Sequence, residues 1–123
     1  GIVFRYMDLS NYWLVNIRPD GSMKLFEVSG GTTTERASVS HTPTAGVDYR
    51  VIVIAEGARI ATYVHPNDGS VGVTTGPAYA TAATGLSATS HGIWYGNGAL
   101  PGRASYDNFV VWPRMVTMPS SQL

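Results

Sequence analysis

Few side chains in this chain could do acid–base or metal chemistry. The 123 residues include eight carboxylates, three histidines and no cysteine, which excludes disulfides and cysteine-ligated metal sites. Glycoside hydrolysis needs two carboxyl groups that face each other across a cleft, whereas Asp20 and Asp68 fall in predicted turns, where Asp is ordinary. His41, His65 and His91 lie far apart, without metal-ligand spacing or a neighbouring nucleophile pattern. These observations argue against an enzyme.

Aromatic and polar residues near predicted strand ends form a second group. Protein sites for sugars combine an aromatic face, which contacts the apolar side of the ring, with polar groups that bond the hydroxyls. The alternative is that such aromatic residues belong to the core and that the arginines are simply solvated. The candidate glycan-binding residues are Arg5, Tyr12, Asn16, Arg18, Trp94 and Tyr95.

Calcium is the one metal that the sequence leaves open. Calcium requires several oxygen ligands, and paired Asp and Asn side chains could supply some of them. The same pairs have a plain explanation, because Asp and Asn commonly form turns through side-chain-to-backbone bonds. Asp107 is the best single candidate, and the pairs are Asp8 with Asn11, Asn67 with Asp68, and Asp107 with Asn108.

Charge and composition limit the partners. The net charge is zero and the sequence has no basic cluster, so the electrostatic signature of nucleic-acid binding is missing. No apolar run reaches 18 residues, so no membrane insertion is expected. Charged residues make up 13% of the chain, about half the usual share, and small and hydroxyl residues take their place. This composition suits an extracellular or virion domain.

Period-two alternation predicts an all-β domain with several short antiparallel strands and no helix. Turn residues separate the strands, as at Pro19–Ser22 and Glu56–Gly57. Residues 70 to 90 are rich in small residues and fit either a tightly packed strand pair or a long loop. The predicted strands are Ile2–Met7, Tyr12–Arg18, Met23–Ser29, Thr34–Ser40, Tyr49–Ala55, Ala58–His65, Ser90–Tyr95 and Ala104–Trp112.

Burial can also be predicted from the pattern. Tyr49–Ala55 is apolar on both faces and is expected to be central, whereas the polar strand Thr34–Ser40 is expected near an edge. The domain is expected to span residues 1–113, with 114–123 as an extended tail or linker. The expected core residues are Phe4, Trp13, Val15, Ile17, Leu25, Val51, Val53, Ile60, Tyr63, Phe109 and Val111.

Segments at the two ends of the chain resemble a known superfamily. The first is Gly1-Ile2-Val3-Phe4-Arg5 followed by Asn11-Tyr12-Trp13, and the second is Ala104-Ser105-Tyr106-Asp107-Asn108-Phe109-Val110-Val111. Together they resemble the concanavalin-A-like lectin/glucanase superfamily, the laminin-G-like jelly rolls. The resemblance covers roughly residues 1 to 112 and implies an antiparallel two-sheet sandwich of jelly-roll type. The glucanases' Glu-x-Asp-x-(x)-Glu string does not occur here, so the resemblance does not extend to their catalytic site.

One departure from the superfamily concerns the N-terminal strands. Members usually carry several strands before the Gly-x-x-Phe-Arg strand, and here the sequence starts at Gly1 without a Met. The sequence is therefore interpreted as a reduced sandwich or as a piece of something longer. We expect a partner strand, from a preceding segment or another subunit, beside Ile2–Met7 or another exposed edge, and hence a multimeric assembly.

Three function classes remain. The first is a non-catalytic recognition module that binds glycans or a cell-surface polysaccharide within a larger secreted or virion protein, such as a phage minor tail protein used in host attachment. The alternative is a purely structural or subunit-interaction domain of a phage virion. A glycoside hydrolase domain is third. A shared fold cannot decide among them, because one fold hosts many sites.

Overall fold

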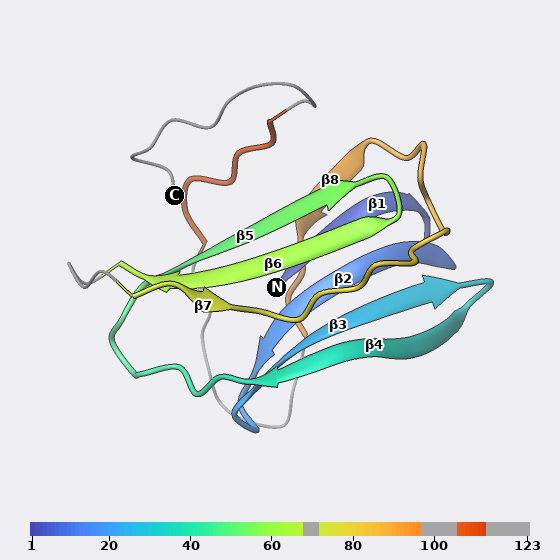
Figure 1. The fold of residues 1–123 in the computed structure, drawn as a ribbon. Helices are drawn as coiled ribbons and strands as arrows, with labels where there is room; N and C mark the ends of the chain where they lie inside the picture. The colour runs from blue at the N-terminus through green and yellow to red at the C-terminus, as the bar shows by residue number, and fades with distance from the viewer. Residues whose placement is uncertain (68–71, 97–105, 113–123) are drawn as a thin grey trace.

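A computed structural model describes residues 1–67, 72–96 and 106–112. Strands and turns make up these residues, and the strands form two antiparallel sheets of five and three strands (Figure 1). The expected all-β, two-sheet sandwich is confirmed. The jelly-roll assignment stays a prediction. No helix capable of crossing a membrane occurs in the described part of the chain.

The larger sheet begins as a meander. β1 (Ile2–Asp8), β2 (Asn11–Arg18), β3 (Ser22–Ser29) and β4 (Thr32–Ser40) follow one another through tight turns, and β8 (Ser90–Ile93) completes the order β4-β3-β2-β1-β8. Gly21 and Gly31 take positive φ angles of 81° in two of these turns, a conformation that a side chain disfavours. The polar strand β4 lies at an edge, as its sequence predicted.

The smaller sheet consists of β5 (Tyr49–Glu56), β6 (Arg59–Pro66) and the two-residue β7 (Thr74–Thr75), in the order β5-β6-β7. β5 and β6 pair over their full length without a register shift. Gly57, with φ of 53°, lies in the turn between them. β5 is therefore an edge strand of the smaller sheet, and its predicted central position was wrong. β6 takes that place.

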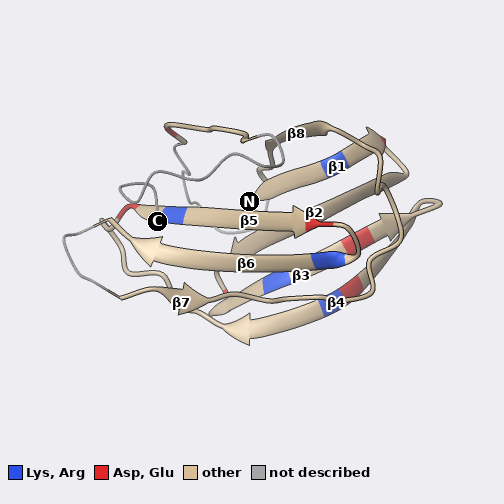
Figure 2. Cartoon of the chain, turned by 45° about the horizontal axis from the view of Figure 1, so that its top comes forward, with Lys and Arg blue, Asp and Glu red and all other residues tan. Residues whose placement is uncertain are grey.

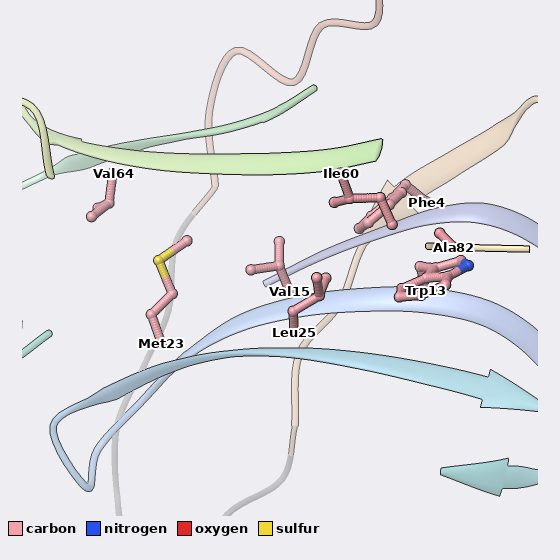
Figure 3. Close-up of a cluster of buried hydrophobic side chains, with 8 residues drawn as sticks. All are labelled: Phe4, Trp13, Val15, Met23, Leu25, Ile60, Val64 and Ala82. Carbon is pink, nitrogen blue, oxygen red and sulfur yellow. The ribbon is translucent and has the colours of Figure 1, made fainter. Parts of the chain in front are cut away.

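The core lies between the two sheets (Figure 3). β1 to β3 contribute one wall and β6 the opposite wall, each through alternate residues of a half-buried strand. Trp13 is fully buried, and its ring lies 6.4 Å from that of Phe4. The core cluster comprises Phe4, Trp13, Val15, Met23, Leu25, Ile60, Val64 and Ala82.

Residues 76–85 close the sandwich beside β6. The hydroxyl of Thr62 donates to the carbonyl oxygen of Pro77 at 2.6 Å in a buried position. The indole N–H of Trp13 donates to the carbonyl oxygen of Thr84 at 2.9 Å. Of the two forms considered for the stretch 70–90, its described part is mostly a long loop. It contains the short β7, then a coil hydrogen-bonded to the core, then the start of β8.

Two further expectations about the core and strands were wrong. Phe109 and Val111 are 41% and 52% exposed, and residues 106–112 form no strand. Alternation of apolar residues does not by itself produce a strand, because a strand also requires pairing and packing with its neighbours. The expected core residues Ile17, Val51, Val53 and Tyr63 are half-buried, while the other five are buried. The expected tail, 114–123, lies outside the described residues.

The structure rules out a partner strand beside Ile2–Met7, whereas a partner strand at another exposed edge stays a prediction. β1 pairs with β2 on one side and with β8 on the other, so neither edge of β1 is open to a strand from elsewhere. The chain supplies this neighbour itself, from a segment about 90 residues later. Within the described residues, the edges of the two sheets are instead formed by β4, β8, β5 and β7.

Candidate functional site

The outer face of the five-stranded sheet, the side that faces away from β5–β7, carries part of the predicted site. Trp13 and Val15 point inward into the core, so strand alternation places Tyr12, Asn16 and Arg18 on the opposite side of β2. Tyr12 is half-buried, and Asn16 is only 5% exposed. The side-chain oxygen of Asn16 has no hydrogen-bond partner among the described residues.

A bulge in β1 turns Tyr6 towards the same face. Arg5 takes a positive φ of 49°, and the pairing of β1 with both neighbours shifts at this point. Such a bulge adds a residue to one strand and redirects the side chains beyond it. As a result, the rings of Tyr6 and Tyr12 lie 6.0 Å apart between centroids, tilted by 34°.

An open hollow lies beside Tyr6, between β1 and β8. Its volume is about 230 Å³, and we call it the Tyr6 hollow; its lining residues are Val3, Tyr6, Ser90, His91 and Gly92. Ser90 is directly opposite Tyr6, and Gly92 is opposite Val3. The hollow therefore combines the aromatic ring of Tyr6 with the hydroxyl-bearing residue Ser90 on one face of the sheet, and His91 lies between Ser90 and Gly92 in its lining.

His91 lies against the bulge of β1 and accepts a hydrogen bond from it. Its Nδ1 accepts a hydrogen bond from the backbone N–H of Arg5 at 3.2 Å. Burial lowers the pKa of His91, and the positive charge of Arg5 lowers it further. The neutral ring with Nδ1 as acceptor carries its proton on Nε2, so His91 has a hydrogen-bond donor left for another group.

Arg5 itself is an interior residue. It is 5% exposed, and its Nη2 donates to the carbonyl oxygen of Gly57 at 2.6 Å, across the space between the sheets. Its Nη1 is buried without a hydrogen-bond partner in the described structure. The structure thus separates Arg5 from Tyr12, Asn16 and Arg18, the other candidate glycan-binding residues at the start of the chain.

The remaining predicted residues lie at the end of the sheet near Gly1. Trp94 continues the β8 ladder, with its N–H donating to the carbonyl oxygen of Gly1 at 2.9 Å, and its own carbonyl accepts from the Tyr106 hydroxyl at 2.8 Å. A Cβ added to Gly1 would lie 2.9 Å from the Cβ of Asn16, so Gly1 lies between Asn16 on β2 and Trp94 after β8. Tyr95 is 57% exposed.

Arg18 forms an ion pair with Asp20 in the β2–β3 turn. Its Nε lies 3.3 Å from the Asp20 carboxylate, and both side chains are largely exposed. An exposed ion pair of this kind contributes little to stability, because water screens it. Arg18 therefore lies at the β2–β3 turn, whereas the Tyr6–Tyr12 pair lies towards the other end of β2.

The proposed calcium ligands are not gathered into one place. Asp107 is exposed and accepts a hydrogen bond from the N–H of its neighbour Asn108 at 2.8 Å. Asp8 accepts from the N–H of Ser10 at 2.7 Å and from the Asn11 amide, which is the turn-forming alternative. In the described part of the chain, no group of three or more His, Asp or Glu side chains could hold a metal ion. Asp68 lies outside that part.

A larger groove lies on the smaller sheet. Its volume is about 440 Å³, and Ile54, Tyr63 and Tyr79 provide its apolar lining, with Glu56 and Arg59 at the β5–β6 turn. Its size falls in the usual range for small-molecule sites, unlike that of the Tyr6 hollow. The groove and the Tyr6 hollow lie on different sheets and share no lining residue. Substitutions in one can therefore be used to test its role independently of the other.

Sequence reasoning missed Tyr6 and His91. Tyr6 stands in a strand whose simple alternation gives no reason to pair it with Tyr12, because the bulge at Arg5 decides its direction. His91 gains its role only from the pairing of β8 with β1. The positive φ of Arg5 determines where Tyr6 and His91 lie. No local signal in the sequence predicts that a non-glycine residue takes this conformation.

Comparison with protein-family models, with curated proteins and with solved structures found no match to this chain.

Proposed function

We propose that this chain is a non-catalytic recognition module that binds glycans of a cell surface through the outer face of its five-stranded sheet. The observation that carries the proposal is the Tyr6–Tyr12 pair, with centroids 6.0 Å apart, beside the Tyr6 hollow. The resemblance to the concanavalin-A-like superfamily agrees with it, as does an extracellular or virion setting such as a phage tail.

The chemistry of this patch suits a sugar ring. One side of a pyranose ring carries C–H groups that pack on an aromatic face, and the hydroxyls require hydrogen-bond partners. Tyr6 and Tyr12 supply aromatic surface, the Ser90 hydroxyl can donate and accept, and the His91 Nε2–H can donate. A volume of about 230 Å³ has room for a single sugar residue rather than for a long oligosaccharide.

Such a small contact implies weak binding. A single sugar residue has about a dozen non-hydrogen atoms, and at roughly 0.3–0.7 kcal/mol per atom its dissociation constant is about millimolar to micromolar. Useful affinity then requires many copies, since linked sites raise the apparent affinity by roughly 10²–10⁴ without new contacts. The test should therefore use protein displayed in many copies on a bead or scaffold.

The experiment measures binding of the multivalent protein to a glycan array and to isolated bacterial cell walls. Tyr6→Ala and Tyr12→Ala are expected to abolish binding, because each removes half of the aromatic surface. Tyr63→Ala is the matched control, a half-buried tyrosine on the outer face of the other sheet, and it should bind normally. Thermal unfolding of each variant verifies that the fold persists.

Other outcomes would overturn the proposal. Loss of binding with Tyr63→Ala but not with Tyr6→Ala would place the ligand in the groove of the smaller sheet. No binding by any multivalent preparation would favour the alternative, a structural or subunit-interaction domain of a virion. Release of reducing sugar from a polysaccharide by the purified domain would make it a hydrolase.

A further inference from the structure

The most apolar strand of the chain lies at an edge. β5 contains the run Val51-Ile52-Val53-Ile54, and it pairs with β6 on one side only, within the part of the chain that the structure describes. Figure 1 shows it at the margin of the smaller sheet. The N–H and C=O groups of alternate β5 residues therefore point towards the free side.

The two long edge strands of the domain, β4 and β5, differ in how well their free backbone edges are protected from pairing with another strand. β4 is rich in Thr and Ser, and its pairing with β3 is interrupted by a register shift at Leu25–Phe26. Polar residues and bulges are the usual means by which edges are protected from pairing. β5 has neither a bulge nor a proline, and all eight of its residues pair regularly with β6. Its edge is suited to accept another strand.

We propose that two copies of this chain associate through β5, antiparallel and about a twofold axis at Val53. The two three-stranded sheets would join into one continuous sheet of six strands. In this register Val53 faces its own copy, Ile52 faces Ile54, and Val51 faces Ala55. Residues of the same parity face each other, so each outward-pointing amide meets an outward-pointing carbonyl of the other copy.

The charges of β5 select this register. Arg50 and Glu56 are three residues before and after Val53, so the twofold axis places Arg50 of each copy opposite Glu56 of the other. Figure 2 shows these opposite charges at the two ends of β5. Moving the axis by one residue, to Ile52 or Ile54, would set each charge opposite an apolar residue or beyond the strand. Opposite charges directly across an antiparallel pair stabilise it, and like charges destabilise it.

Pairing would also cover apolar surface that the single chain leaves partly open. Val51 and Val53 point to the core but are only half-buried, because no strand of the described part of the chain lies beyond them. Ile54 on the outer side is 43% exposed. In the dimer each of these side chains gains a cross-strand neighbour from the second copy. This proposal does not depend on glycan binding, although a dimer would present two Tyr6 hollows.

The test measures the dimer dissociation constant of the 123-residue chain by analytical ultracentrifugation across a concentration series. Arg50→Glu and Glu56→Arg are each expected to weaken the dimer about tenfold, because each converts both symmetric ion pairs into like-charge pairs. The double variant should restore the dissociation constant to within about threefold of the original. Within one chain the two residues are roughly 20 Å apart, so restoration must arise between copies.

Controls separate the interface from general effects of charge. Lys24→Glu makes the same charge change in the other sheet and should leave the dimer unaffected. Glu56 is exposed, so Glu56→Arg tests the interface even if Arg50→Glu fails to fold. A chain that stays monomeric at every concentration would overturn the proposal, as would a double variant no better than the single ones. A Lys24→Glu variant that dissociates would place the interface at β3–β4 instead.

Discussion

The guanidinium group of Arg5 in β1 donates a hydrogen bond of 2.6 Å to the carbonyl oxygen of Gly57, in the turn between β5 and β6. These residues are 52 positions apart in the chain and belong to different sheets. Arg5 was predicted to bind a glycan, but it links the two layers of the sandwich. The positive φ of Arg5, 49°, is part of the bulge that aims the side chain inward.

Arg5→Ala should destabilise the domain by roughly 1–3 kcal/mol, the usual cost of losing a hydrogen bond to a charged group. The burial that lowers the pKa of Arg5 opposes its charged form, which keeps the cost at the lower end. Arg18→Ala, at an exposed ion pair, should change stability by less than about 0.5 kcal/mol. Urea unfolding measures both. If the Arg5→Ala variant were as stable as the parent chain but no longer bound glycan, Arg5 would be a ligand-binding residue instead.

Gly76→Ala should destabilise the domain by roughly 1–3 kcal/mol, the cost of overpacking a core. Gly76 is buried, and a Cβ there would press on the Thr62 hydroxyl and lie 3.0 Å from the Met23 sulfur. The hydroxyl cannot move freely, because it donates to the Pro77 carbonyl. Gly72→Ala is the control, since its Cβ would meet no atom within 4 Å. Equal melting temperatures for the two variants would contradict the packing described here.

Phe4→Ala and Phe109→Ala should differ sharply, although both residues lie in motifs of the same superfamily resemblance. Phe4 is 3% exposed beside Trp13, so its truncation should cost about 3–5 kcal/mol. Phe109 is 41% exposed, so its truncation should cost less than about 1 kcal/mol. Chemical denaturation of the two variants gives the comparison. A large loss in Phe109→Ala would mean that residues 106–112 pack on the sandwich in solution.

Stability should fall in mild acid because of His91. The pKa of the unfolded residue is near 6.5, and burial and Arg5 lower it in the fold. The folded protein then binds fewer protons than the unfolded chain, so this contribution is complete above pH 6.5 and is lost as the pH falls through the lower, folded value. Protonation of Nδ1 also removes the acceptor for the Arg5 N–H.

The measurement is the unfolding free energy between pH 8 and pH 5 for the parent chain and for His91→Gln. The variant has no titrating group at this position, so its stability should depend less on pH over that interval. An identical slope in both proteins would assign the acid sensitivity to another group.

Much of the strand pattern could be read directly from the chain. β1 to β6 lie within two residues of their predicted bounds at each end, because alternation of apolar and polar residues and the turn residues between them are local properties. Trp13 and Val15 were assigned to the buried face of β2 for the same reason, and they are fully buried. The two-sheet architecture followed from many short strands and no helical period.

The sequence predicted the edge position of β4, but tertiary structure alone decided that β5 is an edge strand and where the site is. The apolar strand β5 is an edge, because neighbours are set by sheet pairing between distant segments and not by a strand's own composition. The same holds for Tyr6 and His91, which meet only because β8 pairs with a bulged β1. The sequence by itself determined which residues form strands and which face of β2 is apolar. The pairing of β1 with β8, some 90 residues apart in the chain, decided which side chains lie next to one another on these faces.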